Sequence, residues 1–284
     1  MSESSHALLN SLSLDPQLAL FAVAADAAGD GGELGEETLD EMAALVERGG
    51  LADLDPRRVW PVLARGLMST RPSRMLSALA ACGALARLLP ELAALFGRYQ
   101  TGFDGEPVDI GLHQGRVVDA AAARNAPLRV RLAALLCNLG KADSPPQHLP
   151  AHYRQIDRCL PRIVNVCARF GIAAELEDFA ILVAMELERV HRATRMRAGS
   201  LTALLERVDA FGELARFEDL LTVCACDYFA YPGNTTPAYP KAALLRQALA
   251  ACLAADQAND DDETPRHERR AMAVAQALRS CRDE

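Results

Sequence analysis

The chain has 284 residues, of which 50% are hydrophobic and 24% charged, as in ordinary globular proteins. Its formal net charge is −8, whereas a protein that binds nucleic acid on its own usually carries a basic surface. Tight independent RNA binding is therefore disfavoured, although a local basic face stays open because arginine far outnumbers lysine and suits phosphate contacts. No signal peptide or membrane-length apolar run is found in the sequence, so we expect a cytoplasmic protein without membrane attachment.

Residues 1–13 are polar and rich in serine, and we expect them to be disordered. Leucine and alanine dominate the apolar residues that follow, while valine and isoleucine are sparse, which favours an all-α fold. Helical spacing predicts helices over 16–28 and 37–48, with a loop rich in Gly, Asp and Glu between them. Asp55 and Pro56 have the pattern of an N-cap followed by the first residue of a helix.

Pro61 should kink that helix or end its first turns. Two further helices are expected to open on prolines, over 72–88 and 90–96, and a Gly- and Asp-rich loop over 97–108 should follow. The remaining pattern is again helical, interrupted by a loop at 231–240 and an acidic run at 256–263 that is expected to be a solvated linker. The remaining helices are expected over 111–124, 128–139, 152–170, 174–190, 201–211, 216–228, 241–255 and 265–279.

Eight cysteines lie along the chain, most of them within these apolar helical patterns. No pair of C-x-x-C motifs occurs, so a structural zinc site is not expected. We expect the thiols to be reduced and to pack as small hydrophobic side chains. The positions are Cys82, Cys137, Cys159, Cys167, Cys224, Cys226, Cys252 and Cys281.

The most informative stretch is Leu135-Leu136-Cys137-Asn138-Leu139-Gly140-Lys141. A helix that ends in such an L-G-K turn resembles the central signature of HD-domain proteins, in which an adjacent His and Asp bind a divalent metal that activates water against a phosphoester. Here Cys137 and Asn138 occupy the places of that pair. Neutral asparagine is a poor replacement for a carboxylate, and cysteine ligates only as a thiolate and prefers softer metals.

The resemblance extends to other blocks in the same order along the chain, over roughly residues 40–240. They are similar to the helical part of bacterial CCA-adding tRNA nucleotidyltransferases that carry a C-terminal HD domain, and a series of blocks is much more specific than one motif. The blocks are Leu54–Trp60, Cys82–Leu85, Leu89–Gly97, Asp109–His113 and Cys137–Lys141.

This resemblance implies an all-α fold in which a multi-helix HD-like bundle follows a helical neck. The implied divisions are a disordered segment 1–13, a neck- or body-like segment 14–100, a degenerate HD-like domain 101–240, and C-terminal helices with an acidic linker over 241–284. The nucleotidyltransferase head of the family is not expected in this chain. The pair Asp53 and Asp55 imitates the head's Asp-x-Asp motif, but Pro56 and a helical pattern follow at once, so the pair is not expected to be catalytic.

The resemblance matches each metal ligand of the HD family to one residue of this sequence. The first His of the family matches His113, the His-Asp pair matches Cys137 and Asn138, and the closing Asp matches Asp227. In the family's His-rich block the leading His matches His152, while the later His falls on Gln155; the His of the F-H-D block falls on Leu187. Only His113, His152 and Asp227 keep a ligand type, and a catalytic site needs about three protein ligands and an open position. We therefore expect no bound metal and no cofactor.

Four arginines, Arg189, Arg192, Arg195 and Arg197, cluster near the end of one expected helix. Phosphate contact with RNA or a nucleotide is one interpretation, and a solvated basic loop is the other. His191 lies among them and is expected at an exposed helix end, where a cation stabilises the helix dipole.

Two functional hypotheses follow. In the first, the chain has lost metal-dependent catalysis and binds RNA such as tRNA, a nucleotide or a protein partner. In the second, it is a residual phosphohydrolase that uses a divalent metal at a remodelled site of His113, Cys137, His152 and Asp227. A third, weaker hypothesis is a subunit that works with a separate nucleotidyltransferase head. The sequence does not indicate an oligomeric state.

Overall fold

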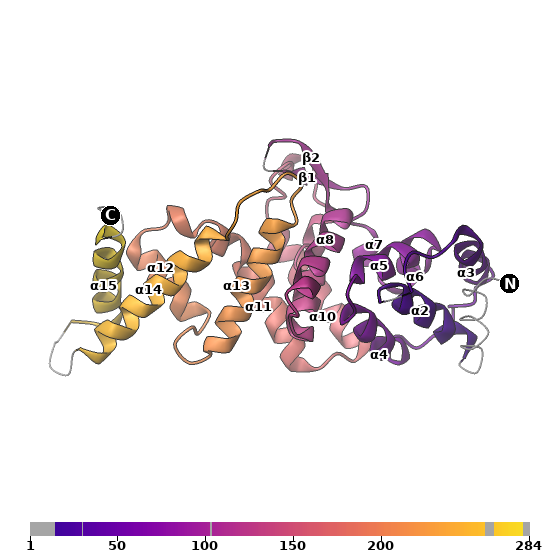
Figure 1. Cartoon of the computed structure of the whole chain (residues 1–284), viewed down its shortest axis with the longest axis horizontal. Helices are drawn as coiled ribbons and strands as arrows, with labels where there is room; N and C mark the ends of the chain where they lie inside the picture. The colour runs from indigo at the N-terminus through magenta and orange to yellow at the C-terminus, as the bar shows by residue number, and fades with distance from the viewer. Residues whose placement is uncertain (1–14, 30, 103, 259–263, 281–284) are drawn as a thin grey trace.

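The computed structural model describes residues 15–29, 31–102, 104–258 and 264–280. The helices form an elongated array, with the N-terminal helices at one end and the C-terminal helix at the other (Figure 1). Two three-residue strands make up all the sheet within these described ranges. The predicted all-α fold is confirmed, while the disorder expected over 1–13 falls outside the described residues.

The N-terminal end of the array is built from six helices. Asp55 caps α4 as predicted, because its side chain accepts a hydrogen bond from the backbone N–H of Arg57 at 3.0 Å. Pro61 lies within α4 and does not end it, so that part of the expectation was wrong. The six helices are α2 (Pro16–Ala27), α3 (Glu36–Glu47), α4 (Pro56–Leu67), α5 (Pro72–Ala81), α6 (Ala84–Leu88) and α7 (Pro90–Ala93).

Two local expectations fail in this region. The single helix expected over 72–88 is broken between α5 and α6, where Gly83 takes a φ of 77° that side chains disfavour. The loop expected over 97–108 contains an antiparallel hairpin of β1 (Tyr99–Thr101) and β2 (Pro107–Asp109), in which Tyr99 lies opposite Asp109. Such short strands are too brief to leave an alternating pattern in the sequence.

The central and C-terminal parts agree with the predicted order of helices. The main difference is the start of α10, which lies at Gln155 because His152 and Arg154 both adopt positive φ angles, 51° and 58°. The elements are α8 (Ile110–Ala123), α9 (Leu128–Leu136), η1 (Leu139–Lys141), η2 (Pro146–His148), α10 (Gln155–Phe170), α11 (Ala174–His191), η3 (Ala193–Arg195), α12 (Ala198–Arg207), α13 (Leu214–Phe229), α14 (Pro240–Gln257) and α15 (Arg266–Ser280).

One hydrophobic cluster runs through helices on both sides of residue 100. Buried polar contacts join the same two parts. Arg131 on α9 donates to the carbonyl oxygens of Leu67 and Ser69, both at 2.8 Å, and so satisfies acceptors at the C-terminal end of α4. Asp119 on α8 accepts from the backbone N–H of Ser73 at 2.9 Å and so caps α5 from a distance. The proposed division into domains stays a prediction, but these two parts pack as neighbours.

The seven cysteines within the described ranges are free and buried, which confirms their use as small hydrophobic side chains. Cys281 lies outside those ranges. None of the helices described is both long and apolar enough to cross a membrane.

Candidate functional site

Asp227 is the centre of a buried polar cluster in the middle of the array. Its helix, α13, packs against α8 and α11. The imidazole Nε2 of His113, on α8, lies 3.0 Å from Asp227 Oδ1, and the Nε2 of His191, at the end of α11, lies 3.0 Å from Oδ2. Three helices therefore meet through one carboxylate, each of whose oxygens accepts a hydrogen bond from a different imidazole. We call His113, Asp227 and His191 the His–Asp–His cluster.

Two tyrosines extend the cluster. The hydroxyl of Tyr239, at the start of α14, lies 2.8 Å from the second ring nitrogen of His191. The ring of Tyr231 packs on that of His113, with 4.4 Å between the ring centroids. Because the hydroxyl is positioned to donate to Nδ1, the other nitrogen of His191 is set to donate to Asp227. The loop between α13 and α14 is thus held against the cluster.

The electrostatics of the cluster favour an ionised carboxylate. Burial alone would raise the pKa of the Asp227 carboxyl, but hydrogen bonds from His113 and His191 hold that pKa well below its usual range. Each oxygen of the carboxylate therefore has a hydrogen-bond donor from the protein. The Nδ1 atom of His113 is buried and lacks a hydrogen-bond partner among the described residues.

Cys137 and Asn138, in the places of the HD pair, are completely buried. Burial raises the pKa of the Cys137 thiol well above its ordinary value, and the nearby charge of Asp227 raises it further. The Asn138 amide donates to Gln114 Oε1 at 2.9 Å, and Gln114 in turn donates to the carbonyl oxygen of Ala134. A neutral thiol and an amide that is already hydrogen-bonded are weak ligands for a hard divalent ion.

Gln114 was missed by the sequence analysis. It is adjacent to His113 and fully buried, and it joins α8 to the end of α9. A buried glutamine next to the expected first ligand is the signal that could have identified it, because buried amides require hydrogen-bond partners.

The L-G-K turn has a structural explanation of its own. A Cβ atom at Gly140 would overlap the carbonyl oxygen of Gln155, so glycine lets α10 approach the turn closely. From α10, Arg158 donates to the carbonyl oxygen of Gly140 at 2.8 Å and Arg162 donates to that of Leu139 at 2.6 Å. Lys141 donates to Gln100 Oε1 of β1 at 2.7 Å. The motif thus fixes the packing between the turn, α10 and the hairpin.

The other residues of the predicted site do not contact the His–Asp–His cluster. Both ring nitrogens of His152 are engaged elsewhere, 2.8 Å from Ser144 Oγ and 2.9 Å from the carbonyl oxygen of Tyr99. Burial lowers the pKa of His152, so its neutral form is favoured. Gln155 is buried at the start of α10, and Leu187 belongs to the apolar core.

The second histidine of the cluster is instead His191, which was not among the residues predicted for the HD site. The sequence analysis placed it correctly at a helix end but wrongly in an exposed position, since only 25% of its side chain is exposed. Its partner, Asp227, lies 36 residues further along the chain. Sequence spacing alone could not pair them.

A pocket of about 320 Å³ opens beside the cluster. Lys241 lies at this pocket with its ammonium nitrogen 5.0 Å from the ring centroid of Tyr228 and 5.7 Å from that of Tyr239. No carboxylate in the described part of the chain pairs with Lys241. The pocket therefore combines a cation, aromatic rings and two members of the cluster, and its lining is Thr101, Gly102, His191, Asp227, Tyr228, Tyr231 and Lys241.

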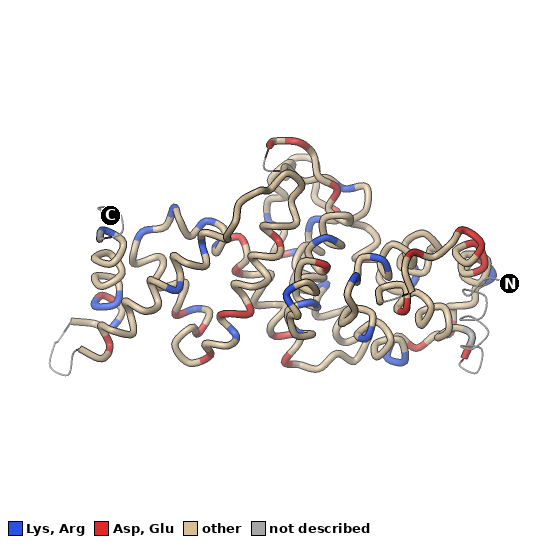
Figure 2. The backbone as a smooth tube through the Cα atoms, viewed as in Figure 1, with Lys and Arg blue, Asp and Glu red and all other residues tan. Residues whose placement is uncertain are grey.

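The four arginines of the predicted phosphate contact divide into two pairs. Arg189 donates to Glu186, which also accepts from Arg207, and Arg192 donates to Glu188, each at 2.9 Å. Arg195 and Arg197 are exposed and form no ion pair with any described carboxylate. Along the described part of the chain, basic and acidic positions are interspersed (Figure 2). We call residues 192–197 the arginine turn.

No group of three His, Cys, Asp or Glu side chains in the described ranges is arranged to hold a metal ion. The geometry gives a reason, because the Nε2 atoms of His113 and His191 point at the carboxylate oxygens rather than toward a shared vacant point. The donor set therefore does not fit a divalent ion without rearrangement.

These elements define an all-helical protein whose central polar cluster joins three helices. No protein-family profile matches the chain. It is 41% identical over 230 residues to a multifunctional CCA protein of Nitrosospira multiformis, an alignment that covers 81% of this chain and 56% of that protein. The corresponding protein of Paraburkholderia phymatum is 42% identical over 251 residues, covering 85% of this chain and 60% of that protein. That of Cupriavidus necator is 43% identical over 220 residues, 78% of this chain and 54% of that protein.

The chain is therefore homologous to multifunctional CCA proteins, which confirms the resemblance to CCA-adding tRNA nucleotidyltransferases that the sequence blocks predicted. It spans between 54% and 60% of the length of these three relatives.

Proposed function

We propose that this chain is an HD-like relative of tRNA nucleotidyltransferases that has lost metal-dependent catalysis and binds RNA, with the arginine turn and the pocket at Lys241 as its contacts. The observation that carries the proposal is that each oxygen of the Asp227 carboxylate accepts a hydrogen bond from an imidazole, one from His113 and the other from His191. A metal at this carboxylate would have to compete with both imidazoles for its oxygens.

The neighbouring side chains support the same conclusion. Metal-assisted hydrolysis requires anionic or neutral ligands with free lone pairs and a water-accessible position on the ion. The thiol of Cys137 is held protonated by burial, and the amide of Asn138 is hydrogen-bonded to Gln114. Restoring a metal site would require all of these groups to change partners together.

Binding of an anionic polymer is supported by the unpaired cations. Lys241 lies over two tyrosine rings at the pocket, and Arg195 and Arg197 are exposed on the arginine turn. Arginine and lysine contact phosphates, and tyrosine rings can stack on bases. RNA is the favoured ligand because the relatives are named CCA proteins, with tRNA as the first candidate. A free nucleotide and a protein partner are the alternatives.

Metal content tests the catalytic part of the proposal. Purified protein should contain no stoichiometric Mn, Ni, Fe, Zn or Mg by mass spectrometry, and titration of each ion should produce no saturable binding. Stoichiometric binding that disappears in Asp227→Asn would contradict the proposal. Binding that persists in Asp227→Asn would place the ion elsewhere.

Fluorescence anisotropy with labelled tRNA transcript tests the binding part. Lys241→Met and the double variant Arg195→Met with Arg197→Met should each weaken binding, and the salt dependence of binding should become shallower. Arg246→Met is the matched control, because Arg246 is an exposed arginine that pairs with Glu218 at 2.6 Å and lies outside both proposed contacts. Equal affinity in all variants would exclude these contacts, and absence of tRNA binding with tight binding of a mononucleotide would favour the nucleotide alternative.

A residual phosphohydrolase is the second candidate, favoured by the opening of a pocket directly beside His191 and Asp227. Under this candidate a divalent ion would displace the imidazoles from the carboxylate. Turnover of cyclic nucleotides, nucleoside monophosphates or simple phosphoesters with added divalent ions, lost in His113→Ala, would support it. No turnover above that of His113→Ala would exclude it.

A further inference from the structure

Helix α15 is held to the molecule by a network of ion pairs as well as by apolar contacts. It packs across α12 and α14 at one end of the array (Figure 1). Among its described side chains only Arg270 and Val274 are buried, and they lie one helical turn apart on the same face. A docked amphipathic helix ordinarily presents several apolar side chains along such a face. Here one of the two deepest positions is a guanidinium.

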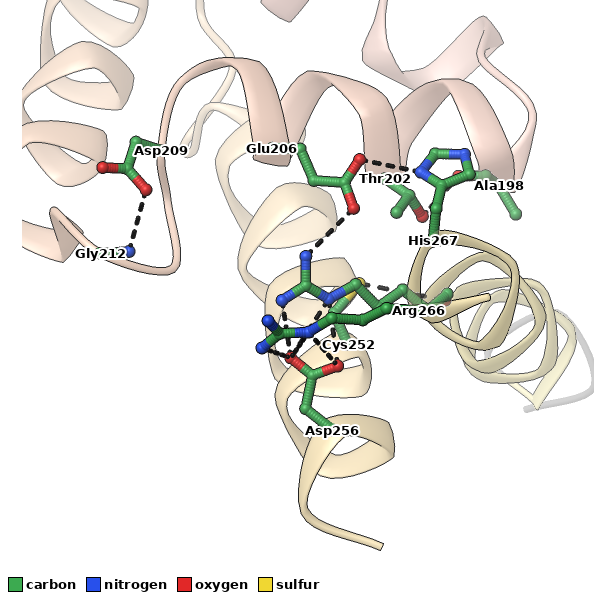
Figure 3. A network of polar contacts seen from close by, with 10 residues as sticks. Ala198, Thr202, Glu206, Asp209, Gly212, Cys252, Asp256, Arg266 and His267 are labelled. Atoms are coloured by element: carbon green, nitrogen blue, oxygen red, sulfur yellow. Dashed lines mark hydrogen bonds and ion pairs between the residues drawn. The ribbon is translucent and has the colours of Figure 1, made fainter. Parts of the chain in front are cut away.

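The partners of that guanidinium form a compact network (Figure 3). Arg270 donates to Asp256 of α14 at 2.6 Å and to Glu206 of α12 at 3.0 Å. Arg266 donates to the same Asp256 at 2.7 Å, and His267 lies 2.8 Å from Glu206. We call Glu206, Asp256, Arg266, His267 and Arg270 the α15 clasp. Its two carboxylates are contributed by α12 and α14, and its two guanidinium groups and its imidazole by α15.

The clasp lies where α15 packs on α12 and α14. The guanidinium carbon of Arg270 lies 3.6 Å from the ring centroid of Phe211, and the backbone oxygen of Arg270 lies 3.9 Å from the fully buried thiol of Cys252. Burying an arginine is costly unless its charge is paired and its N–H groups are hydrogen-bonded. The docked state therefore depends on Asp256 and Glu206 as acceptors.

The C-terminal part of α15 reaches the arginine turn. Leu278 of α15 lines a pocket of about 220 Å³ together with Thr194, Met196 and Leu201. The other lining residues come from α14 and η3. Removal of α15 would leave one wall of the arginine turn without its support.

We propose that α15 is a releasable cover, held by the α15 clasp, whose departure exposes the surface of α12 and α14 that it covers and loosens the arginine turn. The release of the cover stands on the clasp geometry alone, whereas its effect on RNA binding rests on the proposed function. The chemistry that would compete with it is an acidic partner for the arginines or a basic helix for Asp256 and Glu206.

Hydrogen exchange of the full chain tests the cover. Arg270→Met keeps an apolar stem of similar length but removes the charge and all its hydrogen bonds. Amides of 266–279 and 193–197 should exchange at least roughly tenfold faster in Arg270→Met than in wild type, because a local opening becomes more populated. Alkylation of Cys252, followed by mass spectrometry, should accelerate in parallel. Arg246→Met removes an ion pair between α14 and α13 without touching α15, and should change neither reading.

Each outcome decides a different part of the proposal. Unchanged exchange in α15 and unchanged alkylation of Cys252 in Arg270→Met would overturn the proposal, because apolar contacts would then suffice to dock the helix. If Arg270→Met lost helical content throughout, Asp256→Asn would replace it, since that change keeps the side-chain shape and removes one carboxylate. Faster exchange in α15 with no change in 193–197 would refute the link to the arginine turn. Absence of tRNA binding by wild type would contradict the proposed function and would leave the exchange result to decide the cover.

Discussion

The imidazole of His113 and the carboxylate of Asp227 lie 3.0 Å apart, although 114 residues separate them in the chain. The imidazole is completely buried and the carboxylate nearly so. This contact joins α8 to α13, and His191 adds α11 from the other side. A pair of residue types that the sequence related to metal binding therefore forms an internal hydrogen bond between helices.

Asp227→Asn should destabilise the fold, because one imidazole loses its anionic acceptor and an amide N–H faces a donor. Removing one partner of a buried charged pair costs about 3 kcal/mol. Urea unfolding followed by circular dichroism measures the loss. Asp157→Asn is the control, since Asp157 pairs with Arg154 on the surface and should be nearly neutral. An Asp227→Asn variant as stable as the control would show that the cluster contributes little.

The lowered pKa of Asp227 predicts how the free energy of unfolding changes at acidic pH. The pKa of Asp227 is lower in the folded protein than in the unfolded chain, so the folded state binds fewer protons. The stabilisation is present above the unfolded pKa of about 4 and is lost as the pH falls through the folded pKa. The stability difference between wild type and Asp227→Asn should be constant near neutral pH and should shrink below about pH 4. A difference that grows on acidification would contradict the assignment.

Asn138→Asp, the change toward the HD signature, should destabilise rather than restore a site. Asn138 donates to Gln114 Oε1 and is fully buried, so a carboxylate there would face another acceptor in a medium that disfavours charge. The cost should be about 2 kcal/mol or more. It should also increase as the pH rises above the unfolded pKa of the new carboxyl group, because burial raises its folded pKa. Asn125→Asp, at an exposed position, is the control.

Gly140→Ala tests the close packing of the L-G-K turn. The added methyl group would overlap the carbonyl oxygen of Gln155, so α10 must shift and the two arginine hydrogen bonds to the turn must lengthen. We expect a loss of about 2–3 kcal/mol in thermal or urea unfolding. Gly199→Ala should instead be neutral or slightly stabilising, because nothing lies within 4 Å of that position and it falls in the first turn of α12. Equal stability of the two variants would show that the turn tolerates displacement.

The sequence predicted the order of the helices well because leucine and alanine repeat at helical spacing and prolines mark several starts. Asp55 is an example in which the type of the residue determined its structural role. The break at Gly83 and the hairpin at Tyr99 were not predicted, since each depends on a few residues whose conformation is decided by packing. The site was predicted only in part. His113 and Asp227 do meet, but His191 joins them, and Gln114 binds the end of α9, through contacts between distant helices that no local pattern encodes.

His152 illustrates the limit of carrying residues over from a resemblance. Its type matches a ligand, yet its two ring nitrogens bind Ser144 and the backbone of Tyr99. The positive φ angles at His152 and Arg154 set the direction of this segment. Residues other than glycine rarely adopt such angles, so the sequence did not predict them. The identity of a side chain is visible in a sequence, whereas its direction depends on the backbone around it.

The hydrogen bonds that Arg131 donates to Leu67 and Ser69 have a consequence for synthesis. During synthesis the C-terminal end of α4 emerges well before Arg131, which follows Leu67 by 64 residues and binds its carbonyl oxygen. At about 5–20 residues per second the nascent helix waits for several seconds. During that interval its terminal carbonyl groups must be solvated by water or held by other factors. The end of α4 therefore reaches its final hydrogen bonding only after α9 has left the exit tunnel.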